Sequence, residues 1–351
     1  MQIIQMLAAF FFVIQCVAQP SFDENEWLDT IQKAESSALY EAHVDSGGKF
    51  FNPWIKTTKI HFGGSWQLYQ LFTLGKKYDI FPIEEYSAVN NDYIYLLDNS
   101  FDSISFYGHA TLIVKLDGET IFTDPFFSEW ALAAKKKVQI EFDFSNVPDK
   151  PIVLISHNHY DHLDEYSVKE LIKKNAVFIV PLGLKDFFSG LGATEVFELD
   201  WWQSVELKNM RYTFLPSQHV SRRIGYGSME TLWGSFLIEG SKTIYFSGDT
   251  GYFHGFKEFG KLYSIDYALL GAGAYEPRWF MHLTHLGVDD FFRAAKDINA
   301  KTAIPIHFGI IQMTDEPILY PLYKIRQFLN QYPEYAERIH TLRAGEYLEI
   351  R

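Results

Sequence analysis

Three histidines and one aspartate occur within six consecutive residues of this chain, and no other stretch restricts its fold so tightly. Residues 157–162 read His-Asn-His-Tyr-Asp-His and follow an apolar run, residues 152–156, that is typical of a buried strand. Imidazole nitrogens and carboxylate oxygens are ligands that zinc and similar divalent ions accept. In extended backbone His157, His159 and Asp161 point to one side. The run therefore predicts a metal site, against the alternative of a polar loop that is rich in histidine by chance.

Ligand-type residues also follow three further apolar runs. Strands that end at one edge of a scaffold aim the side chains that follow them at a common point. One such residue alone is more often structural, but four coincidences favour a shared site. The three residues are His219 after residues 212–215, Asp249 after residues 244–248, and His307 after residues 303–306.

The number of donors suits two ions. Two metal ions stabilise charge on a phosphoryl oxygen and bring the pKa of bound water to about 7, which makes a nucleophile at neutral pH. A carboxylate has two oxygens and can bridge both ions, so the composition is that of a two-metal hydrolytic site. The first set of donors is His157, His159 and His219, the second is Asp161, His162 and His307, and the bridging residue is Asp249.

The charge balance excludes one class of partner. The chain of 351 residues has 31 Lys and Arg against 44 Asp and Glu, a net charge of −13. Because phosphate backbones are bound by Lys and Arg, an acidic chain argues against nucleic acid as the main partner. The lysine run at residues 135–137 is expected to be a solvated face rather than a binding site.

The first residues have the pattern of a cleaved export signal. An apolar run, residues 6–14, precedes Cys16 and Ala18, which are small residues at the positions that a signal peptidase prefers. We therefore expect a signal peptide at residues 1–18 and export to a periplasm or to the cell exterior. The only cysteine lies in this leader, so the mature chain has no thiolate ligand and no disulfide.

The pattern of apolar residues and turns divides the remaining chain into two parts. Residues 19–100 are expected to form an N-terminal extension that packs on the core. From residue 101 short apolar runs alternate with turns and helical stretches, and Asp164 is placed to cap one helix. Strands with interleaved helices predict an α/β sandwich with its helices outside. The expected helices are residues 24–42, 66–74, 165–174, 289–298 and 322–331, and the expected strands are residues 103–107, 111–116, 120–123, 152–156, 177–180, 211–215, 235–238, 243–247, 267–270 and 302–306.

The ligand-type residues resemble the motif of the metallo-β-lactamase superfamily. Longer segments, between about residues 50 and 350, look like the N-acylphosphatidylethanolamine-hydrolysing phospholipase D family. The superfamily motif alone leaves lactonases, thioesterases, nucleases and sulfatases open, and the string 273–281 and the tryptophan pair 201–202 narrow the choice. The matching segments are residues 106–111, 123–125, 156–164, 198–202, 216–219, 232–235, 248–252 and 273–281.

The resemblance implies a metallo-β-lactamase-like αββα sandwich, residues 101–351, with two Zn²⁺ and a membrane lipid as substrate. By motif position the seven residues above match the family's zinc ligands, with Asp249 shared. His285 matches a family histidine near the active site, where it binds the substrate phosphate or protonates the leaving alkoxide. The chain departs from the family pattern at Thr284 and at residues 308–310, which puts the headgroup preference in doubt.

These residues together predict a zinc-dependent phosphodiesterase of the phospholipase D type. A metal-bridging hydroxide is expected to attack N-acylphosphatidylethanolamine, or a related phospholipid, and to give an N-acylethanolamine and phosphatidic acid, with Asp249 and His285 as the catalytic residues. The expected partner is a phospholipid at a membrane surface, and homodimer formation is left open. Two alternatives remain: a soluble small-molecule metallo-hydrolase, such as a lactonase or sugar-phosphate phosphodiesterase, and a non-catalytic lipid carrier.

Several side chains near the site have two interpretations each. Asp124 either orients a ligand histidine or is a turn carboxylate, and Tyr160 either lines the path of the substrate or packs. His109 is expected to be a packed structural histidine. Some aromatic side chains suit either a lipid interface or the protein core, and we favour the core: Phe126, Phe127, Trp130 near Leu132, Trp201 and Trp202. Two arginines, Arg222 and Arg223, either contact the substrate phosphate or belong to a solvated loop.

Overall fold

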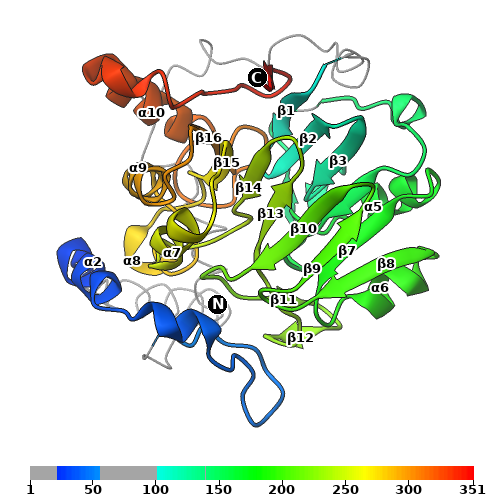
Figure 1. The fold of residues 1–351 in the computed structure, drawn as a ribbon, viewed down its shortest axis with the longest axis horizontal. Coiled ribbons are helices and arrows are strands. Elements are labelled where there is room, and N and C mark those ends of the chain that lie inside the picture. The colour runs from blue at the N-terminus through cyan, green and yellow to red at the C-terminus, as the bar shows by residue number, and fades with distance from the viewer. Residues whose placement is uncertain (1–21, 56–100, 139) are drawn as a thin grey trace, which may run out of the picture.

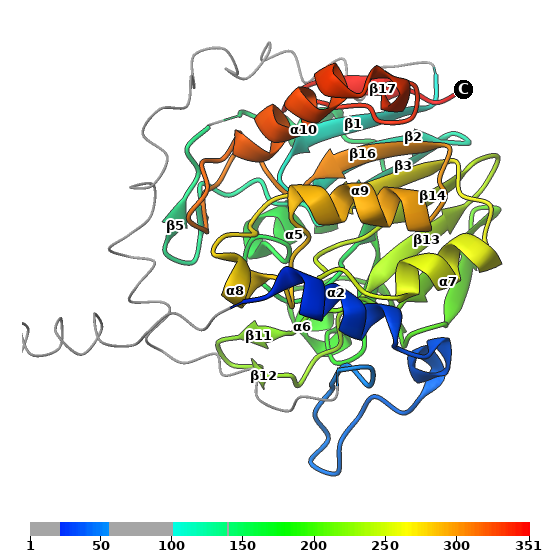
Figure 2. The same ribbon diagram turned by 90° about the vertical axis from the view of Figure 1, so that its left-hand side faces the viewer.

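The structure, a computed structural model, describes residues 22–55, 101–138 and 140–351. Within them two β-sheets pack together, and helices cover the outer side of each sheet (Figure 1, Figure 2). This arrangement confirms the αββα sandwich that the sequence predicted. The expected export signal, residues 1–18, and the expected helix at residues 66–74 lie outside the described residues.

The first sheet has seven strands and contains the strand that precedes the histidine run. The strands are β1 (Ser103–Gly108), β2 (Thr111–Leu116), β3 (Glu119–Thr123), β6 (Ile152–Leu154), β7 (Val177–Pro181), β8 (Glu195–Leu199) and β17 (Tyr347–Glu349). They lie in the order β17-β1-β2-β3-β6-β7-β8, antiparallel up to β3 and parallel from β3 onward.

The second sheet has six strands, and three of them precede the other ligand-type residues. The strands are β9 (Ser204–Leu207), β10 (Met210–Leu215), β13 (Ser235–Glu239), β14 (Thr243–Phe246), β15 (Tyr267–Gly271) and β16 (Thr302–Ile306). They lie in the order β16-β15-β14-β13-β10-β9, in which β14, β15 and β16 are parallel to one another. Two short hairpins stand apart from both sheets, β4 (Trp130–Ala131) with β5 (Ala134–Lys135), and β11 (Arg222–Arg223) with β12 (Gly227–Ser228).

Helices cover the two sheets separately. Leu171 of α5 and Phe188 of α6 pack in one apolar cluster with the outer face of the first sheet, and Phe259 of α7 and Phe291 of α9 pack in the cluster of the second. The α-helices are α2 (Glu24–Gln32), α5 (Glu165–Ile172), α6 (Lys185–Gly190), α7 (Gly255–Leu262), α8 (Arg278–Met281), α9 (Val288–Asp297) and α10 (Tyr320–Gln331), and the 3₁₀ helices are η1 (Ser36–Tyr40), η3 (Phe144–Asn146) and η4 (Pro333–Tyr335).

Strand β2 shows why an alternating run makes a strand in this fold. Leu112 and Val114 pack in the central cluster, whereas Ile113 packs in the outer cluster beneath the helices, because successive side chains of a strand point to opposite faces. The next two residues, Asp117 and Gly118, both have positive φ angles, 53° and 81°, as a tight hairpin turn requires. The predicted strand at residues 111–116 and its hairpin are therefore confirmed.

The predicted helix at residues 24–42 is wrong in its length. Helix α2 ends at Gln32, Glu35 has extended backbone (φ −84°, ψ 135°), and η1 follows. The change of direction lets Leu39 become buried, and its carbonyl accepts a hydrogen bond from Trp202 Nε1 at 2.9 Å. Helical spacing of apolar residues does not record such a turn, because both short helices face the same core.

The described part of the N-terminal segment, residues 22–55, packs directly behind the candidate ligands. Asn52 Nδ2 donates to the carbonyl oxygen of His219 at 2.9 Å, and Trp54 Nε1 donates to Gln218 Oε1 at 3.0 Å. Asn52 and Trp54 are both buried. The segment therefore fixes the backbone that carries one candidate ligand.

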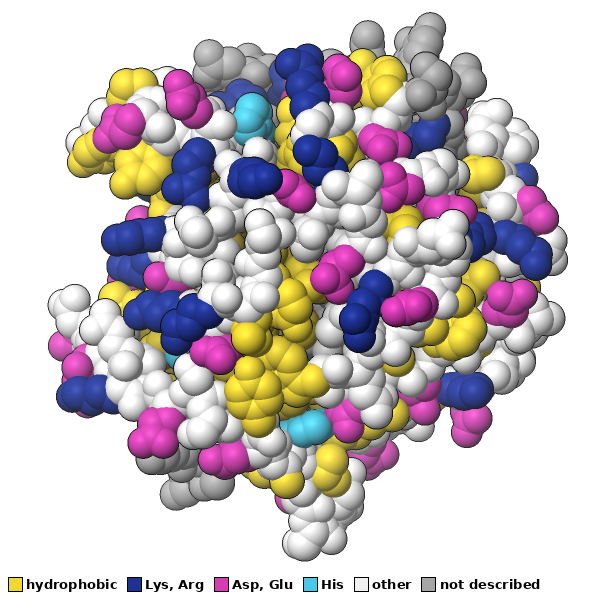
Figure 3. All heavy atoms as spheres, in the orientation of Figure 1, with side chains coloured by type: hydrophobic (Ala, Val, Ile, Leu, Met, Phe, Trp, Pro, Cys, Tyr) yellow, Lys and Arg dark blue, Asp and Glu magenta, His cyan; other side chains and the backbone are white. Residues whose placement is uncertain are grey.

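The surface carries no simple charge stripe on the face seen in Figure 1, where acidic and basic side chains are interspersed (Figure 3). The expectation of a solvated lysine run is wrong for Lys136, which is 5% exposed. Its Nζ donates to the carbonyl oxygen of Phe126 at 2.7 Å and lies 4.2 Å from the centre of the Phe126 ring. Burial lowers the pKa of Lys136 to about 7. Among the described residues, no helix has both the length and the apolar character to cross a membrane.

Asp164 caps α5, as predicted, and its carboxylate also accepts hydrogen bonds from outside that helix. Its carboxylate accepts from the backbone nitrogens of Tyr166 and Ser167, and also from Ser128 N at 2.9 Å and Ser128 Oγ at 2.6 Å. It therefore ties α5 to the segment that leads away from β3. We predict that Asp164→Ala lowers the free energy of unfolding by about 3 kcal/mol, because several buried or partly buried donors lose their acceptor.

The matched control is Asp23→Ala, which removes the exposed cap of α2. Among the described residues the carboxylate of Asp23 accepts from Asn25 N and Glu26 N alone, so we expect a loss of about 1 kcal/mol. Urea unfolding of the two variants beside the parent chain measures both values. Equal losses would show that the contacts of Asp164 outside its helix contribute nothing.

Candidate metal centre

The ligand-type residues lie where strands of both sheets end. His157 follows β6 of the first sheet, while His219, Asp249 and His307 follow β10, β14 and β16 of the second. The two sheets approach each other closely here, because Gly248 has φ 53° and a Cβ on it would lie 2.5 Å from Ser156 Cβ. A residue with a side chain at 248 would push the two strand ends apart.

A first group of donors contains three imidazoles and one carboxylate. His157 Nε2 lies 2.8 Å from His159 Nδ1, and His219 Nε2 lies 3.2 Å from the same nitrogen. Asp249 Oδ2 lies 3.8 Å from the Nε2 atoms of both His157 and His219. All four donor atoms lie within 4.8 Å of one another, so they can surround one ion.

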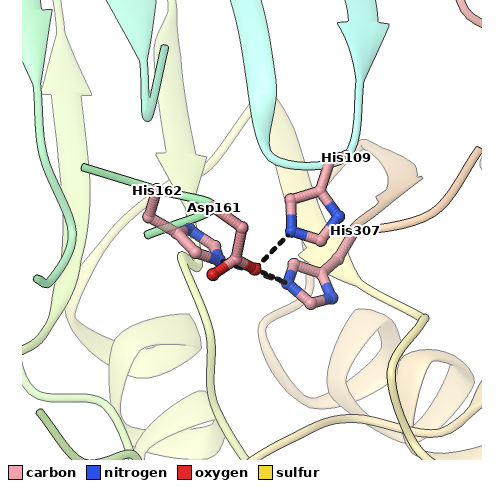
Figure 4. Close-up of side chains that lie close together, drawn as sticks. All are labelled: His109, Asp161, His162 and His307. Atoms are coloured by element: carbon pink, nitrogen blue, oxygen red, sulfur yellow. Dashed lines mark hydrogen bonds and ion pairs between the residues drawn. The ribbon is translucent and has the colours of Figure 1, made fainter. Parts of the chain in front are cut away.

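A second group lies beside the first and is drawn in Figure 4. Asp161 stands between the rings of His162 and His307, with its Oδ2 at 3.3 and 3.9 Å from their Nε2 atoms. The two Nε2 atoms are 3.2 Å apart. His109 completes this group, with its Nε2 2.7 Å from Asp161 Oδ2.

Asp249 reaches both groups. Its Oδ1 lies 2.9 Å from His307 Nε2, and its Oδ2 lies 3.2 Å from His162 Nε2, in addition to the contacts with the first group. The structure therefore brings all seven predicted ligands together, with the carboxylate predicted to bridge at the centre.

The far side of each ring decides which nitrogen carries the proton. His219 Nδ1 lies 2.9 Å from the carbonyl oxygen of Thr284, and His307 Nδ1 lies 3.3 Å from the carbonyl oxygen of Gly273. Carbonyl oxygens only accept, so these Nδ1 atoms donate, and a neutral ring then presents a bare Nε2 lone pair to the cluster. Bare lone pairs about 3 Å apart repel each other unless a cation lies between them.

The pKa values of His157, His219 and Asp249 agree with neutral imidazoles beside an ionised carboxylate. Burial holds the pKa of His157 and of His219 well below the usual value. Burial alone would raise the pKa of Asp249, but the surrounding His162, His307 and His285 hold it well below its usual range. Neutral imidazole and ionised carboxylate are the forms that bind divalent metal ions. His162 differs, because Asp249, Asp161 and Asp124 outweigh burial and hold its pKa well above its usual value.

Asp124 supports both groups from behind. It accepts from His162 Nδ1 at 2.7 Å, from Ser156 N at 2.7 Å and from Ser156 Oγ at 2.5 Å. Because Ser156 Oγ donates to Asp124, the same oxygen accepts from His157 Nδ1 at 2.9 Å. One buried carboxylate thus orients a histidine in each group, which the sequence had anticipated for a single histidine.

His109 was not expected to take part. Its ring is buried, and its backbone nitrogen and oxygen pair with residues 308 and 307 at 2.8 and 2.7 Å. Its Nε2 contact with Asp161 makes it a candidate donor, or the residue that holds that carboxylate. The signal was present in the sequence, because His109 directly follows the apolar run of β1, just as the other ligand-type residues follow theirs.

His285 lies at the open side of the cluster. Its Nε2 is 3.1 Å from Asp249 Oδ2, and its Nδ1 is 2.9 Å from Thr284 Oγ1. Its side chain is 13% exposed, whereas those of His157, His219 and Asp249 are at most 2% exposed. A substrate that approaches from solvent therefore meets His285 before it meets the buried donors.

A charged network holds the backbone of His285. Arg278 Nη1 donates to the His285 carbonyl oxygen at 3.4 Å, and Arg278 Nη2 pairs with Asp290 at 2.6 Å. Asp290, which is buried, also pairs with Arg293 at 2.8 Å, and Arg293 pairs with Glu24 of α2 at 3.0 Å. The N-terminal helix is thus connected to the open side of the site.

Arg223 clamps the histidine run and is not available to a substrate phosphate. Its Nη1 donates to the carbonyl oxygens of Asn158 at 3.1 Å and Leu163 at 2.9 Å, and its guanidinium lies 4.2 Å from the centre of the Tyr160 ring. Tyr160 is half-buried, and its hydroxyl accepts from Ile224 N at 3.3 Å. Tyr160 therefore packs at the edge of the site, while Arg222 remains exposed.

Comparisons with known proteins agree with this geometry. A family model described as Beta-lactamase superfamily domain matches residues 119–308. The chain is 35% identical to N-acyl-phosphatidylethanolamine-hydrolyzing phospholipase D 1 of Caenorhabditis elegans over 243 residues, which cover 64% of this chain and 68% of that protein. It is 31% identical to the mitochondrial protein of the same name from Saccharomyces cerevisiae over 255 residues, which cover 68% of this chain and 54% of that protein.

A solved structure shares the fold at low identity. Igni18, a metallo hydrolase from Ignicoccus hospitalis, superposes with a TM-score of 0.53 at 17% identity, over 72% of this chain and 99% of that chain. The donor set, the outward hydrogen bonds of the rings and the convergence on Asp249 fit two divalent ions, so the cluster has the composition and geometry of a binuclear metal site.

We predict that Asp124→Asn weakens metal binding by about 10- to 100-fold. An asparagine offers one oxygen where the carboxylate accepts three hydrogen bonds, so a donor then faces the amide nitrogen and at least one ring loses its orientation. Competition between the apo protein and a coloured chelator measures the affinities. Asp200→Asn is the control, because Asp200 pairs with His43 at 2.8 Å outside the cluster. Equal affinities in both variants would contradict the orienting role of Asp124.

Proposed function

Because the chain belongs to the N-acylphosphatidylethanolamine-hydrolysing phospholipase D family of the metallo-β-lactamase superfamily, we propose that it is a zinc-dependent phosphodiesterase. Its substrate is N-acylphosphatidylethanolamine or a related phospholipid, and its products are an N-acylethanolamine and phosphatidic acid. The observation that carries the proposal is the convergence of six donors, five of them buried and His159 half-buried, around the buried carboxylate of Asp249, from the ends of both sheets. Nitrogen and oxygen donors without a thiolate suit zinc in a catalytic site.

The seven residues would hold two ions, His157, His159 and His219 on one side and Asp161, His162 and His307 on the other. Bound zinc supplies a positive centre for phosphoryl oxygens and brings water to a pKa near 7. Asp249 keeps the two groups in register, because its two oxygens contact histidines of both. The buried surroundings exclude bulk water and strengthen these charge interactions.

The open side of the metal centre, where His285 lies, is placed to protonate the leaving group. In the proposed reaction a water oxygen bonds to phosphorus, the bond from phosphorus to the ethanolamine oxygen breaks, and the departing oxygen takes a proton. His285 is the partly exposed imidazole beside Asp249, so its Nε2 is placed to give that proton. Thr284 and Arg278 fix the ring and its backbone, which keeps this proton at the mouth of the site.

Asp249 is predicted to be essential for turnover. Asp249→Asn is expected to lower turnover of N-acylphosphatidylethanolamine by about a thousandfold or more, because the amide cannot serve both groups as an acceptor. Mass spectrometry of the released N-acylethanolamine and phosphatidic acid measures the rate, and thermal unfolding checks that the fold survives. A near-normal rate would remove Asp249 from the mechanism.

The substrate class is tested with the parent chain. N-acylphosphatidylethanolamine in vesicles is compared with a water-soluble phosphodiester and a lactone at equal concentrations. Preference for the lipid by at least about tenfold supports the proposal. Hydrolysis of the soluble compounds alone would favour a soluble small-molecule metallo-hydrolase, and lipid binding without turnover would favour a carrier.

Two substrates distinguish protonation of the leaving oxygen by His285 from binding of the substrate phosphate by His285. If His285 protonates the leaving oxygen, His285→Ala lowers kcat on the lipid by about 100-fold or more, but by less than about tenfold on a nitrophenyl phosphodiester, whose leaving group needs no proton. A uniform rise in KM on both compounds, with kcat unchanged, would assign His285 to phosphate binding instead.

A further inference from the structure

Two hairpins carry the most exposed large apolar side chains of the described residues. Ile224, between β11 and β12, is 77% exposed, and Leu132, between β4 and β5, is 63% exposed. Trp130, on the same hairpin as Leu132, is 50% exposed. The other aromatic candidates for a lipid interface behave differently, since Phe126 and Trp201 are buried in the core.

Both hairpins are attached to the loops that carry candidate ligands. Two residues after β5 ends, the backbone nitrogen of Lys137 donates to the carbonyl oxygen of Ile310 at 2.8 Å, and Ile310 lies three residues after His307. Hairpin β11–β12 begins three residues after His219. Figure 2 shows β5, α8, β11 and β12 at one end of the molecule, on the left of the view.

The turn at Leu132 is unfavourable in two respects. Leu132 has φ 52° in the two-residue connection between Ala131 and Ala134, a position that favours glycine or asparagine. A leucine there adopts left-handed backbone and also exposes its apolar side chain to water. Unfavourable local structure that buries neither Leu132 nor Trp130 against the described residues points to a contact with another molecule.

Cations stand behind the apolar tips. Lys135, which pairs with Glu129, lies 5.5 Å from the Trp130 ring, and the side chains of Lys137 and Arg222 are exposed. Apolar tips with an aromatic ring and cations just behind them suit the boundary of a bilayer, where acyl chains meet phosphate groups. Two separate small tips bury too little area for a stable protein interface, which needs about 800 Å² on each side.

We propose that the β4–β5 and β11–β12 hairpins form a lipid-docking surface, in which Leu132, Trp130 and Ile224 insert into a phospholipid bilayer. The inference rests on the proposed function, since it names the surface from which that site takes its substrate. Docking at both hairpins holds the open side of the metal centre, where His285 lies, at the level of the lipid headgroups. The cations face lipid phosphates in this arrangement, despite the net charge of −13 of the whole chain.

The test is a double variant of the full chain, Leu132→Asn with Ile224→Asn. Asparagine suits the backbone of residue 132, so the hairpin is expected to fold. Flotation with phosphatidylcholine vesicles, with and without phosphatidylglycerol, measures binding. We expect binding to fall by about 100-fold, roughly tenfold for each apolar side chain withdrawn from lipid. Hydrolysis of lipid in vesicles is expected to fall in parallel, and the rate on a soluble phosphodiester to stay within about twofold.

Leu262→Asn is the matched control, because Leu262 is 49% exposed on α7, at the other side of the view in Figure 2. It is expected to leave vesicle binding unchanged. Parent-like vesicle binding by the double variant, or an equal loss in the control, overturns the docking surface. If the parent chain binds vesicles through the hairpins and hydrolyses neither lipid nor soluble phosphodiester, the docking surface stands and the proposed function fails.

Discussion

The site depends on one electrostatic constraint: lone pairs that face each other inside the protein must share a positive charge. His162 and His307 present Nε2 atoms 3.2 Å apart, and Asp249 stands within 3.2 Å of both. The far nitrogens of these rings already donate elsewhere, to Asp124 and to the carbonyl oxygen of Gly273. Rotating the rings would break those bonds, so the Nε2 lone pairs stay directed at each other and are satisfied by a positive charge between them, which bound divalent cations supply.

The fold supplies this arrangement by joining the ends of two sheets. Gly248 allows the end of β14 to approach Ser156, and Asp124 orients His162 directly and His157 through the hydroxyl of Ser156. Segments outside the sandwich then hold the loops, with Arg223 on the histidine run and Asn52 on the backbone of His219. The network from Glu24 to Arg278 does the same for His285. The side chains that set the geometry therefore come from the whole described chain.

Sequence patterns predicted much of this because strand ends and ligand chemistry are both local. The strand at residues 111–116, the cap at Asp164 and all seven donors are where the sequence placed them. The patterns failed where a long-range contact decides the outcome. Lys136 is buried and donates to the carbonyl oxygen of Phe126, and Arg223 donates to the carbonyl oxygens of Asn158 and Leu163. Neither partner can be read from the neighbouring residues.

The predictions for His109 and for the helix at residues 24–42 are wrong for the same reason. His109 follows a strand like the other donors, yet only the approach of Asp161 gives its ring a role beyond packing. The helical pattern at residues 24–42 continues across Glu35, although the backbone turns there so that Leu39 packs near Trp202. In both cases the tertiary structure chooses between two readings that the local sequence permits equally.

The central claim, that seven donors surround two divalent ions, is tested most directly by the metal content of the freshly purified full chain. Inductively coupled plasma mass spectrometry, with the protein quantified by amino-acid analysis, gives the number of ions per chain. The account predicts about two transition-metal ions per chain, with zinc the main element. A content near zero in protein that retains its hydrolytic activity in the presence of strong chelators would contradict it.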